Sequence, residues 1–419
     1  MSTPLLLALA CSPDPEPAPE EVSPPPDVLL VVLDTVRADR LGAYRGGLSP
    51  SRAFDALAAQ GVLFEQAVAP SSWTWPSHGS LFTGLGPSEH GAHFAPVDGE
   101  PDLEHLGARL TALREDPPTL AERFAAAGYR TVSLAANPLL DPAFGLTRGF
   151  QRAEHHADDV AVLELAREEL LEQRDAPLFL FVSLMSAHHP TRVSIAPTSA
   201  RHEGRIRARE VGALAPYVRD QPLRIDLYEP REGDEPSGLR RLRSGDLVLE
   251  EEERALLLDL YDGGVHTVDR HLGELLTAWG GEGIRAVTSD HGEYFGEHGL
   301  WEHGRVLLDP ILDVPLVVAA PGLAPERRAE AVAVQELGAT LLHLAGLGED
   351  PGVLDGSELI TATAWPDAQL VPLGAPYDRG WQLVQRPGED ARIDELVPTP
   401  ATTGPVAADE ALRALGYTD

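Results

Sequence analysis

The sequence predicts an α/β fold in which a mainly parallel central sheet is flanked by helices, followed by a small C-terminal subdomain. Short, nearly continuous apolar runs alternate with longer segments of helical periodicity, as expected of strands buried on both faces and connected by helices. The apolar runs cover residues 27–33, 131–134, 178–184, 284–288 and 314–319. The helical patterns cover residues 51–60, 118–127, 158–173, 250–279 and 328–345. Ligands of such folds gather at the carboxyl ends of the strands.

The composition divides the chain into three parts. Residues 1–26 contain a short apolar run that ends before the single cysteine, Cys11, and then a Pro- and Glu-rich stretch. This pattern predicts a lipoprotein-type signal with lipidation at Cys11 and a flexible tether, hence export to the periplasm or cell surface. A plain secretory signal, or merely an apolar N-terminus, is the alternative. Residues 27–348 form the predicted catalytic domain, and 349–419 the C-terminal subdomain with short strands.

The segment 191–248 interrupts the alternation of strands and helices. It is rich in Arg, Pro, Asp and Glu and has weak periodicity. A connection of this length in a compact domain is usually functional or only partly ordered. We therefore expect a long insertion that borders or covers the active site as a lid, or a partly ordered loop.

The charge of the chain excludes one class of partner. The net charge is −33, and all 33 basic residues are arginine. Such a surface repels nucleic acid, so phosphate-backbone binding is not expected. A single cysteine also rules out an intrachain disulfide. No feature of the sequence indicates a protein partner.

Polar residues follow the predicted strands at the points where ligands are expected. Asp34 follows the first strand, and Asn137 and His188 follow the strands at 131–134 and 178–184. A carboxylate at a strand tip is well placed for a metal, although a helix cap is the ordinary role of such an Asp. For His188 and its neighbour His189, a solvated turn is the alternative to a functional role.

Two longer strings carry most of the chemical information. The segment 72–84 reads Ser-Trp-Thr-Trp-Pro-Ser-His-Gly-Ser-Leu-Phe-Thr-Gly, and the segment 289–304 begins Ser-Asp-His-Gly-Glu and continues through Gly-Glu-His-Gly to His303 and Gly304. The first places Thr74 at the start of a helix, where backbone N–H groups and the helix dipole favour an anion. The second places Asp290 and His291 directly after an apolar strand.

These strings, in this order, resemble the sulfatases of the alkaline phosphatase superfamily, from about residue 27 to Tyr417. The resemblance implies a metal site made by Asp34, Thr74, Asp290 and His291. In the usual motif a Cys or Ser, which is oxidised to formylglycine, stands at the position of Thr74, and an Arg stands at that of His78. Thr35 replaces a second metal-binding Asp, and His303 lies near a family lysine.

The resemblance also implies roles for the remaining candidates. Thr74 is the expected nucleophile, and His78 orients it, holds the leaving oxygen or caps the helix. His188, which matches the family motif rather than its neighbour His189, and His303 are expected to bind the anion or protonate the leaving group. Asn137 is expected to contact substrate. One divalent ion (Ca, Mn, Mg or Zn) is expected. A second metal at Asp262 and His266, four residues apart on one helix face, is not expected, since a structural role suits that motif.

Three functions remain open at this point. The first is a metal-dependent hydrolase or transferase that cleaves phosphate esters of small molecules, glycans or lipids through a phosphothreonine. Threonine nucleophiles occur in the phosphodiesterase and phosphotransferase branches of the superfamily, and the covalent intermediate can be cleaved by a second attack at phosphorus. The second is a sulfuric ester hydrolase that works without formylglycine. The third is a degenerate anion-binding protein.

Overall fold

The structure, a computed structural model, describes residues 24–46, 51–92, 94–95, 109–188, 204–220, 223–227, 237–304, 307–348, 382–384 and 392–394. Cys11, His189, Tyr417 and nearly all of the expected C-terminal subdomain lie outside these residues. Of that subdomain only a strand pair is described, β15 (Gln382–Val384) with β16 (Arg392–Asp394). Among the described residues, none of the helices combines the length and the apolarity that a membrane crossing requires.

An eight-stranded sheet forms the centre of the molecule, in the order β14-β2-β13-β10-β1-β7-β5-β6. All neighbouring strands pair in parallel except at β13, which runs antiparallel to β10 and β2. The predicted mainly parallel sheet is thus confirmed. Its strands are β1 (Val28–Leu33), β2 (Val62–Val68), β5 (Arg130–Ala135), β6 (Arg152–His155), β7 (Leu178–Leu184), β10 (Ile284–Thr288), β13 (Asp313–Ala319) and β14 (Glu326–Ala333).

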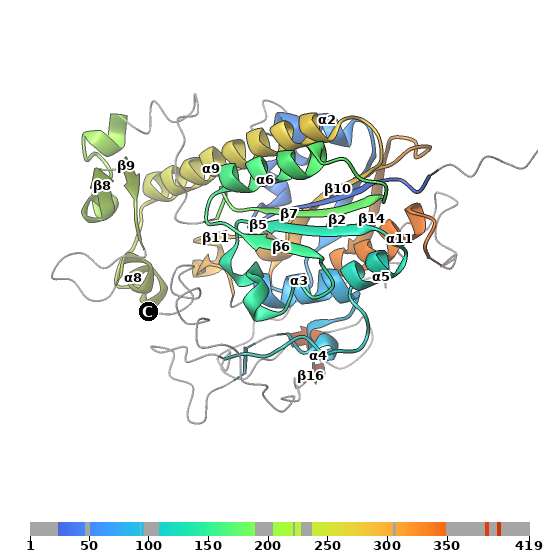
Figure 1. The fold of residues 1–419 in the computed structure, drawn as a ribbon. Helices are drawn as coiled ribbons and strands as arrows, with labels where there is room; N and C mark the ends of the chain where they lie inside the picture. Colours follow the sequence, from blue (N-terminus) through green and yellow to red (C-terminus); the bar gives the residue numbers. More distant parts are fainter. Residues whose placement is uncertain are drawn as a thin grey trace, which may run out of the picture.

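Helices cover both faces of the sheet (Figure 1). One face carries α2 (Arg52–Ala58), α6 (Asp159–Leu171) and the long α9 (Glu251–Trp279); the other carries α3 (Thr74–Thr83), α5 (Leu120–Ala126) and α11 (Leu337–Leu344). Side chains of β1 alternate between the two cores: Leu29, Val31 and Leu33 pack in one, and Val28, Leu30 and Val32 in the other. Burial on both faces explains why β1 is a continuous apolar run.

Short elements complete the fold. Further short α-helices include α1 (Gly42–Arg45), α4 (Pro87–His90), α8 (Gly238–Ser244) and α10 (Asp309–Leu312). Three further hairpins are β3 (Phe94–Ala95) with β4 (Arg109–Leu110), β8 (Val218–Asp220) with β9 (Leu223–Ile225), and β11 (Tyr294–Phe295) with β12 (Trp301–Glu302). The segment 191–248 supplies β8, β9 and α8, which lie beyond one end of α9 (Figure 1).

One predicted element is wrong in its first half. The helix expected over 328–345 is a strand, β14, up to Ala333, and only Leu337–Leu344 forms the helix α11. β14 is the edge strand of the sheet and pairs in parallel with β2. Its Arg, Glu and Ala residues favour a helix in isolation, and pairing with the buried β2 overrides that local preference.

Candidate active site

The carboxyl ends of four parallel strands bring most of the predicted residues together. Asp34 follows β1 directly, and Asn137 follows β5 after one intervening residue. His188 lies in the turn after β7, and Asp290 and His291 come shortly after β10. These strands are neighbours in the sheet, in the order β10-β1-β7-β5. Residues that are up to 257 positions apart therefore meet at one edge of the sheet, as ligand sites of α/β folds do.

Asp34, Asp290 and His291 form a group that could hold a metal ion. One ligand atom from each lies within 4.8 Å of the others, and all three side chains are buried. Nδ1 of His291 lies 2.9 Å from the carbonyl oxygen of Gly292. Because that oxygen can only accept, Nδ1 carries the hydrogen, and Nε2 presents its lone pair, as a metal-binding imidazole must.

The same three residues carry buried polar atoms that lack a hydrogen-bond partner among the residues that the structure describes. These atoms are Oδ1 of Asp34, Oδ2 of Asp290 and Nε2 of His291. Burying such atoms without a partner is costly, so a native structure that does so usually holds an ion or water there. Two carboxylates and an imidazole suit a divalent cation such as Mg²⁺, Ca²⁺, Mn²⁺ or Zn²⁺. The residues present therefore fit the expected metal.

The pKa shifts of these three residues also favour a bound cation. Burial, and then repulsion by the Asp290 carboxylate, raise the pKa of Asp34 well above its ordinary value. Burial acts to raise the pKa of Asp290 as well, but the adjacent imidazoles of His291 and His78 hold it below its ordinary value. Burial lowers the pKa of His291, which keeps the imidazole neutral. A bound cation would remove the repulsion between the two carboxylates.

Thr74 begins α3 and is fully buried beside this group. Nδ2 of Asn137 lies 3.1 Å from the Thr74 hydroxyl oxygen and 2.6 Å from Oδ2 of Asp34. Oδ1 of Asn137 accepts a hydrogen bond of 2.9 Å from the N–H of Leu139. Both ends of the Asn137 amide are thus held within the protein, and its nitrogen joins the Thr74 hydroxyl to a carboxylate of the metal group.

His78 lies one helical turn after Thr74. Its Nδ1 is 3.0 Å from the carbonyl oxygen of Thr74 and 3.6 Å from Oδ2 of Asp290. Its ring packs against Phe82 and Phe181. Burial lowers the pKa of His78, so the ring is neutral. Its contact with Thr74 is to the backbone, which places His78 between the first turn of α3 and the metal group.

His188 and His303 stand in a row of rings that starts at His291. The ring centroid of His303 lies 4.4 Å from that of His291 and 5.0 Å from that of His188. Oε1 of Glu293 lies 3.0 Å from Nδ1 of His303, and both side chains are buried. Sequence reasoning did not assign Glu293 a role. The available signal was its place, two residues after His291 in the same string.

A comparison with family models decides the membership of the chain. The sulfatase model matches residues 26–347, which is most of the chain and includes every residue of the site. The chain belongs to the sulfatase family. It is accordingly an ester hydrolase, as the resemblance of its motifs predicted. No curated protein matches it in sequence.

Solved structures show the same fold as this sulfatase-family chain. The phosphonate monoester hydrolase of Agrobacterium radiobacter is 20% identical with a TM-score of 0.54, and 93% of each chain is covered. The phosphonate monoester hydrolase of Silicibacter pomeroyi is 18% identical with a TM-score of 0.54, covering 93% of this chain and 92% of that one. BT4656, solved with its substrate D-glucosamine-2-N,6-O-disulfate, is 18% identical with a TM-score of 0.55, covering 78% of each chain.

The loop that carries His188 is fixed by a buried carboxylate of this sulfatase-family domain. Asp159, the first residue of α6, accepts hydrogen bonds of 2.7 Å from the N–H of Met185 and 2.9 Å from that of Ser186. The N–H of His188 in turn donates a hydrogen bond of 2.9 Å to the carbonyl oxygen of Met185. The turn after β7 therefore has a defined conformation, and with it the position of the His188 ring.

The alternative metal motif on α9 is engaged in an ion pair. Both carboxylate oxygens of Asp262 accept from the guanidinium of Arg40, with Nε of Arg40 lying 2.8 Å from Oδ1. Asp39, near Arg40 in sequence, forms a bidentate pair with Arg37. Asp262 is thus held by Arg40, and a structural role for this motif stays a prediction.

Proposed function

We propose that this sulfatase-family protein cleaves or transfers phosphoesters through Thr74 as a nucleophile. The observation that carries the proposal is the Asn137 amide, whose nitrogen lies within hydrogen-bonding distance of both the Thr74 hydroxyl and Asp34. The reactive oxygen is thereby held beside the metal group. Structural neighbours include phosphonate monoester hydrolases and BT4656, whose substrate is a disulfated glucosamine, so the fold does not choose between phosphorus and sulfur. Thr74, the residue at the nucleophile position, is the feature that supports phosphorus in this proposal.

Threonine favours phosphorus for a chemical reason. The family route to sulfate cleavage requires an aldehyde formed from Cys or Ser, and threonine is not a known substrate for that oxidation. In the proposed reaction Oγ1 of Thr74 attacks phosphorus, the bond from phosphorus to the leaving alcohol breaks, and a phosphothreonine ester remains. Water or an acceptor alcohol then attacks the same phosphorus and releases the Thr74 oxygen.

The remaining residues position the reactants. A divalent cation held by Asp34, Asp290 and His291 would polarise the ester oxygen and lower the pKa of the attacking hydroxyl. Asn137 holds Thr74, His78 braces the first turn of α3, and Glu293 fixes the ring of His303 through Nδ1. His188 and His303 hold the anion or serve the leaving group.

The test is turnover by the metal-loaded protein on nitrophenyl esters of sulfate, phosphate, a phosphate diester and a phosphonate. Thr74→Ala is the inactive control, and Thr74→Ser keeps a hydroxyl at the same place. We expect phosphoester cleavage that is lost in Thr74→Ala and retained at a reduced rate in Thr74→Ser, with a phosphorylated Thr74 peptide after rapid quenching. Cleavage of the sulfate alone, or no cleavage of any ester, would overturn the proposal.

A further inference from the structure

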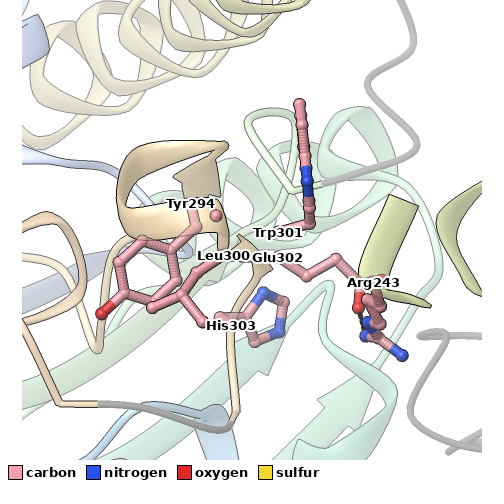
Figure 2. A pocket seen from close by; sticks show the side chains of 7 residues that line it. Arg243, Tyr294, Leu300, Trp301, Glu302 and His303 are labelled. Carbon is pink, nitrogen blue, oxygen red and sulfur yellow. Dashed lines mark ion pairs between the residues drawn. The ribbon is translucent and has the colours of Figure 1, made fainter. Parts of the chain in front are cut away.

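A hollow opens beside His303 and is walled by the β11–β12 hairpin and α8. It encloses about 380 Å³, including its open mouth. Figure 2 shows His303 between the Tyr294 and Leu300 side of the hollow and the side formed by Arg243. The complete lining is Arg243, Tyr294, Gly299, Leu300, Trp301, Glu302 and His303. A concave site with apolar walls and a few convergent polar groups is the usual form of a small-molecule subsite.

The hollow adjoins the metal group. His303, which lines it, is the residue whose ring lies 4.4 Å from that of His291. The segment after the hairpin also contacts the chain that leads into Thr74. The N–H of Gly304 donates a hydrogen bond of 2.8 Å to the carbonyl oxygen of Ser72. The hollow therefore lies next to the metal group, on the side of His303.

Two charged residues of opposite sign meet in this hollow. Arg243 of α8 forms an ion pair with Oε2 of Glu302 (Figure 2). The Glu302 side chain is 7% exposed, whereas that of Arg243 is 23% exposed. Because the guanidinium is already opposed by a carboxylate, the pair offers little net positive charge to a second anion. A carboxylate has about four lone-pair sites, so one guanidinium does not exhaust its capacity to accept.

The backbone at Glu302 is strained. Its φ is 61°, in the left-handed region that non-glycine residues seldom adopt. Residues kept in such conformations cluster at functional sites, where surrounding contacts hold them. Here the contacts are the pairing of Glu302 with Tyr294 across the hairpin and the ion pair with Arg243. The hairpin thus holds the Glu302 carboxylate at the hollow, next to His303, which is expected to bind the anion.

We propose that Glu302 is a specificity-determining residue that excludes esters whose organic part carries a second anionic group. This rests on the proposed function, since it deepens the description of the same site. The favoured organic part is uncharged and hydroxylated: Glu302 accepts from its hydroxyls, Arg243 donates to them, and the apolar walls contact its carbon atoms. A carboxylate or second phosphate in the hollow would find little net positive charge there and would have to compete with Glu302 for the Arg243 guanidinium.

The matched probes are glycerol 2-phosphate and 2-phosphoglycerate, which share the phosphate and differ in one hydroxymethyl group against one carboxylate. Binding is measured by isothermal titration on Thr74→Ala protein in the presence of Mg²⁺, so no turnover is needed. We expect glycerol 2-phosphate to bind about tenfold more tightly, the order of effect that one charged hydrogen bond or repulsion supplies.

Two variants on the same background move this ratio in opposite directions. Glu302→Gln removes the excluding charge and brings the ratio close to one, chiefly because 2-phosphoglycerate binds better. Arg243→Gln leaves the Glu302 charge uncompensated and raises the ratio further. Glu65→Gln, which breaks an exposed ion pair with Arg327 in the β2–β14 part of the sheet, has the same charge change and leaves the ratio unaltered.

Three outcomes would overturn the inference. The first is an equal change in the affinity of both ligands in Glu302→Gln, and the second is a fall of the affinity ratio in Arg243→Gln. The third is no measurable binding of glycerol 2-phosphate. The nitrophenyl panel on the unmodified nucleophile reports separately on the proposed function. A protein that turns over phosphoesters but does not discriminate the two probes sinks only the specificity. A protein that discriminates them without turnover sinks only the reaction.

Discussion

The side-chain nitrogen of Asn137, which follows β5, lies 2.6 Å from Oδ2 of Asp34, which follows β1. Both side chains are buried. The same nitrogen is 3.1 Å from the Thr74 hydroxyl, so one amide sets the distance between nucleophile and metal group. We predict that Asn137→Ala lowers turnover by about 10²-fold, because small displacements of reacting groups cost rates of that order. It also leaves buried partners unsatisfied, at about 1–3 kcal/mol of stability.

Asn137→Asp is the matched variant for this prediction. It has nearly the same shape but places a third carboxylate beside Asp34 and Asp290. The metal-free protein should be less stable than Asn137→Ala at neutral pH, as measured by urea unfolding, and the difference should shrink when divalent metal is added. Wild-type turnover in either variant would contradict the positioning role.

The raised pKa of Asp34 predicts how the metal-free protein responds to pH. The folded state keeps the Asp34 proton at pH values where the unfolded chain, near the ordinary value of 3.8, has lost it. The free energy of unfolding therefore falls as pH rises above about 4. Asp34→Asn removes this loss, so at neutral pH the metal-free variant is the more stable protein. Each tenfold difference in proton affinity corresponds to about 1.4 kcal/mol.

Thermal unfolding of metal-free wild type and Asp34→Asn across pH 4 to 8 checks this. The gap between them should widen with pH, and added divalent metal should stabilise wild type only. Asp220→Asn, at an exposed ion pair with Arg209, provides the control and should follow wild type. A gap that narrows with rising pH would contradict the assignment of the shift to Asp34.

Tyr261 fixes the backbone that follows the first metal-binding carboxylate. Its hydroxyl donates a hydrogen bond of 2.7 Å to the carbonyl oxygen of Thr35 and accepts one of 2.9 Å from the N–H of Arg37. Thr35 has a φ of 59°, which few residues with a β-carbon branch adopt. Tyr261→Phe leaves two buried backbone groups without their partner, and we predict a loss of about 1–3 kcal/mol in urea unfolding.

Tyr129→Phe offers a comparison for Tyr261→Phe. The hydroxyl of Tyr129 makes a single 3.0 Å hydrogen bond, to the carbonyl oxygen of Pro26 at the entry to β1. Removing this hydroxyl should lower the free energy of unfolding by less than Tyr261→Phe does, and it should leave turnover unchanged. Tyr261→Phe should also weaken metal binding, because Asp34 directly precedes the strained Thr35. Equal effects of the two substitutions would argue against a special role for Tyr261.

Asp159 is predicted to act on catalysis only through the loop of His188. In Asp159→Ala the N–H groups of Met185 and Ser186 lose their acceptor, and the turn after β7 relaxes. We expect kcat to fall about tenfold or more, with a smaller change in metal affinity. The neighbouring Asp158 caps α6 through the N–H of Val160. Asp158→Ala should therefore cost about 1 kcal/mol of stability while kcat is retained.

The elements that the sequence predicted correctly are those with a strong local pattern. The runs at 178–184 and 284–288 match β7 and β10 to the residue, because strands buried on both faces must be apolar throughout. β2 and β6 were not predicted, and β14 was taken for part of a helix. These strands lie toward the margins of the sheet and are mixed in composition, so only their pairing partners decide their conformation.

The candidate site divides in the same way. The order of residues along the chain was enough to nominate Asp34, Thr74, Asp290 and His291, since each follows a strand or starts a helix in a recognisable string. The sequence did not reveal that Asn137 joins Asp34 to Thr74 or that Glu293 holds His303. It also gave no sign that Arg243, from the long insertion, meets Glu302 beside the site. Those contacts depend on the relative placement of strand ends, and that placement is set by packing across the whole sheet.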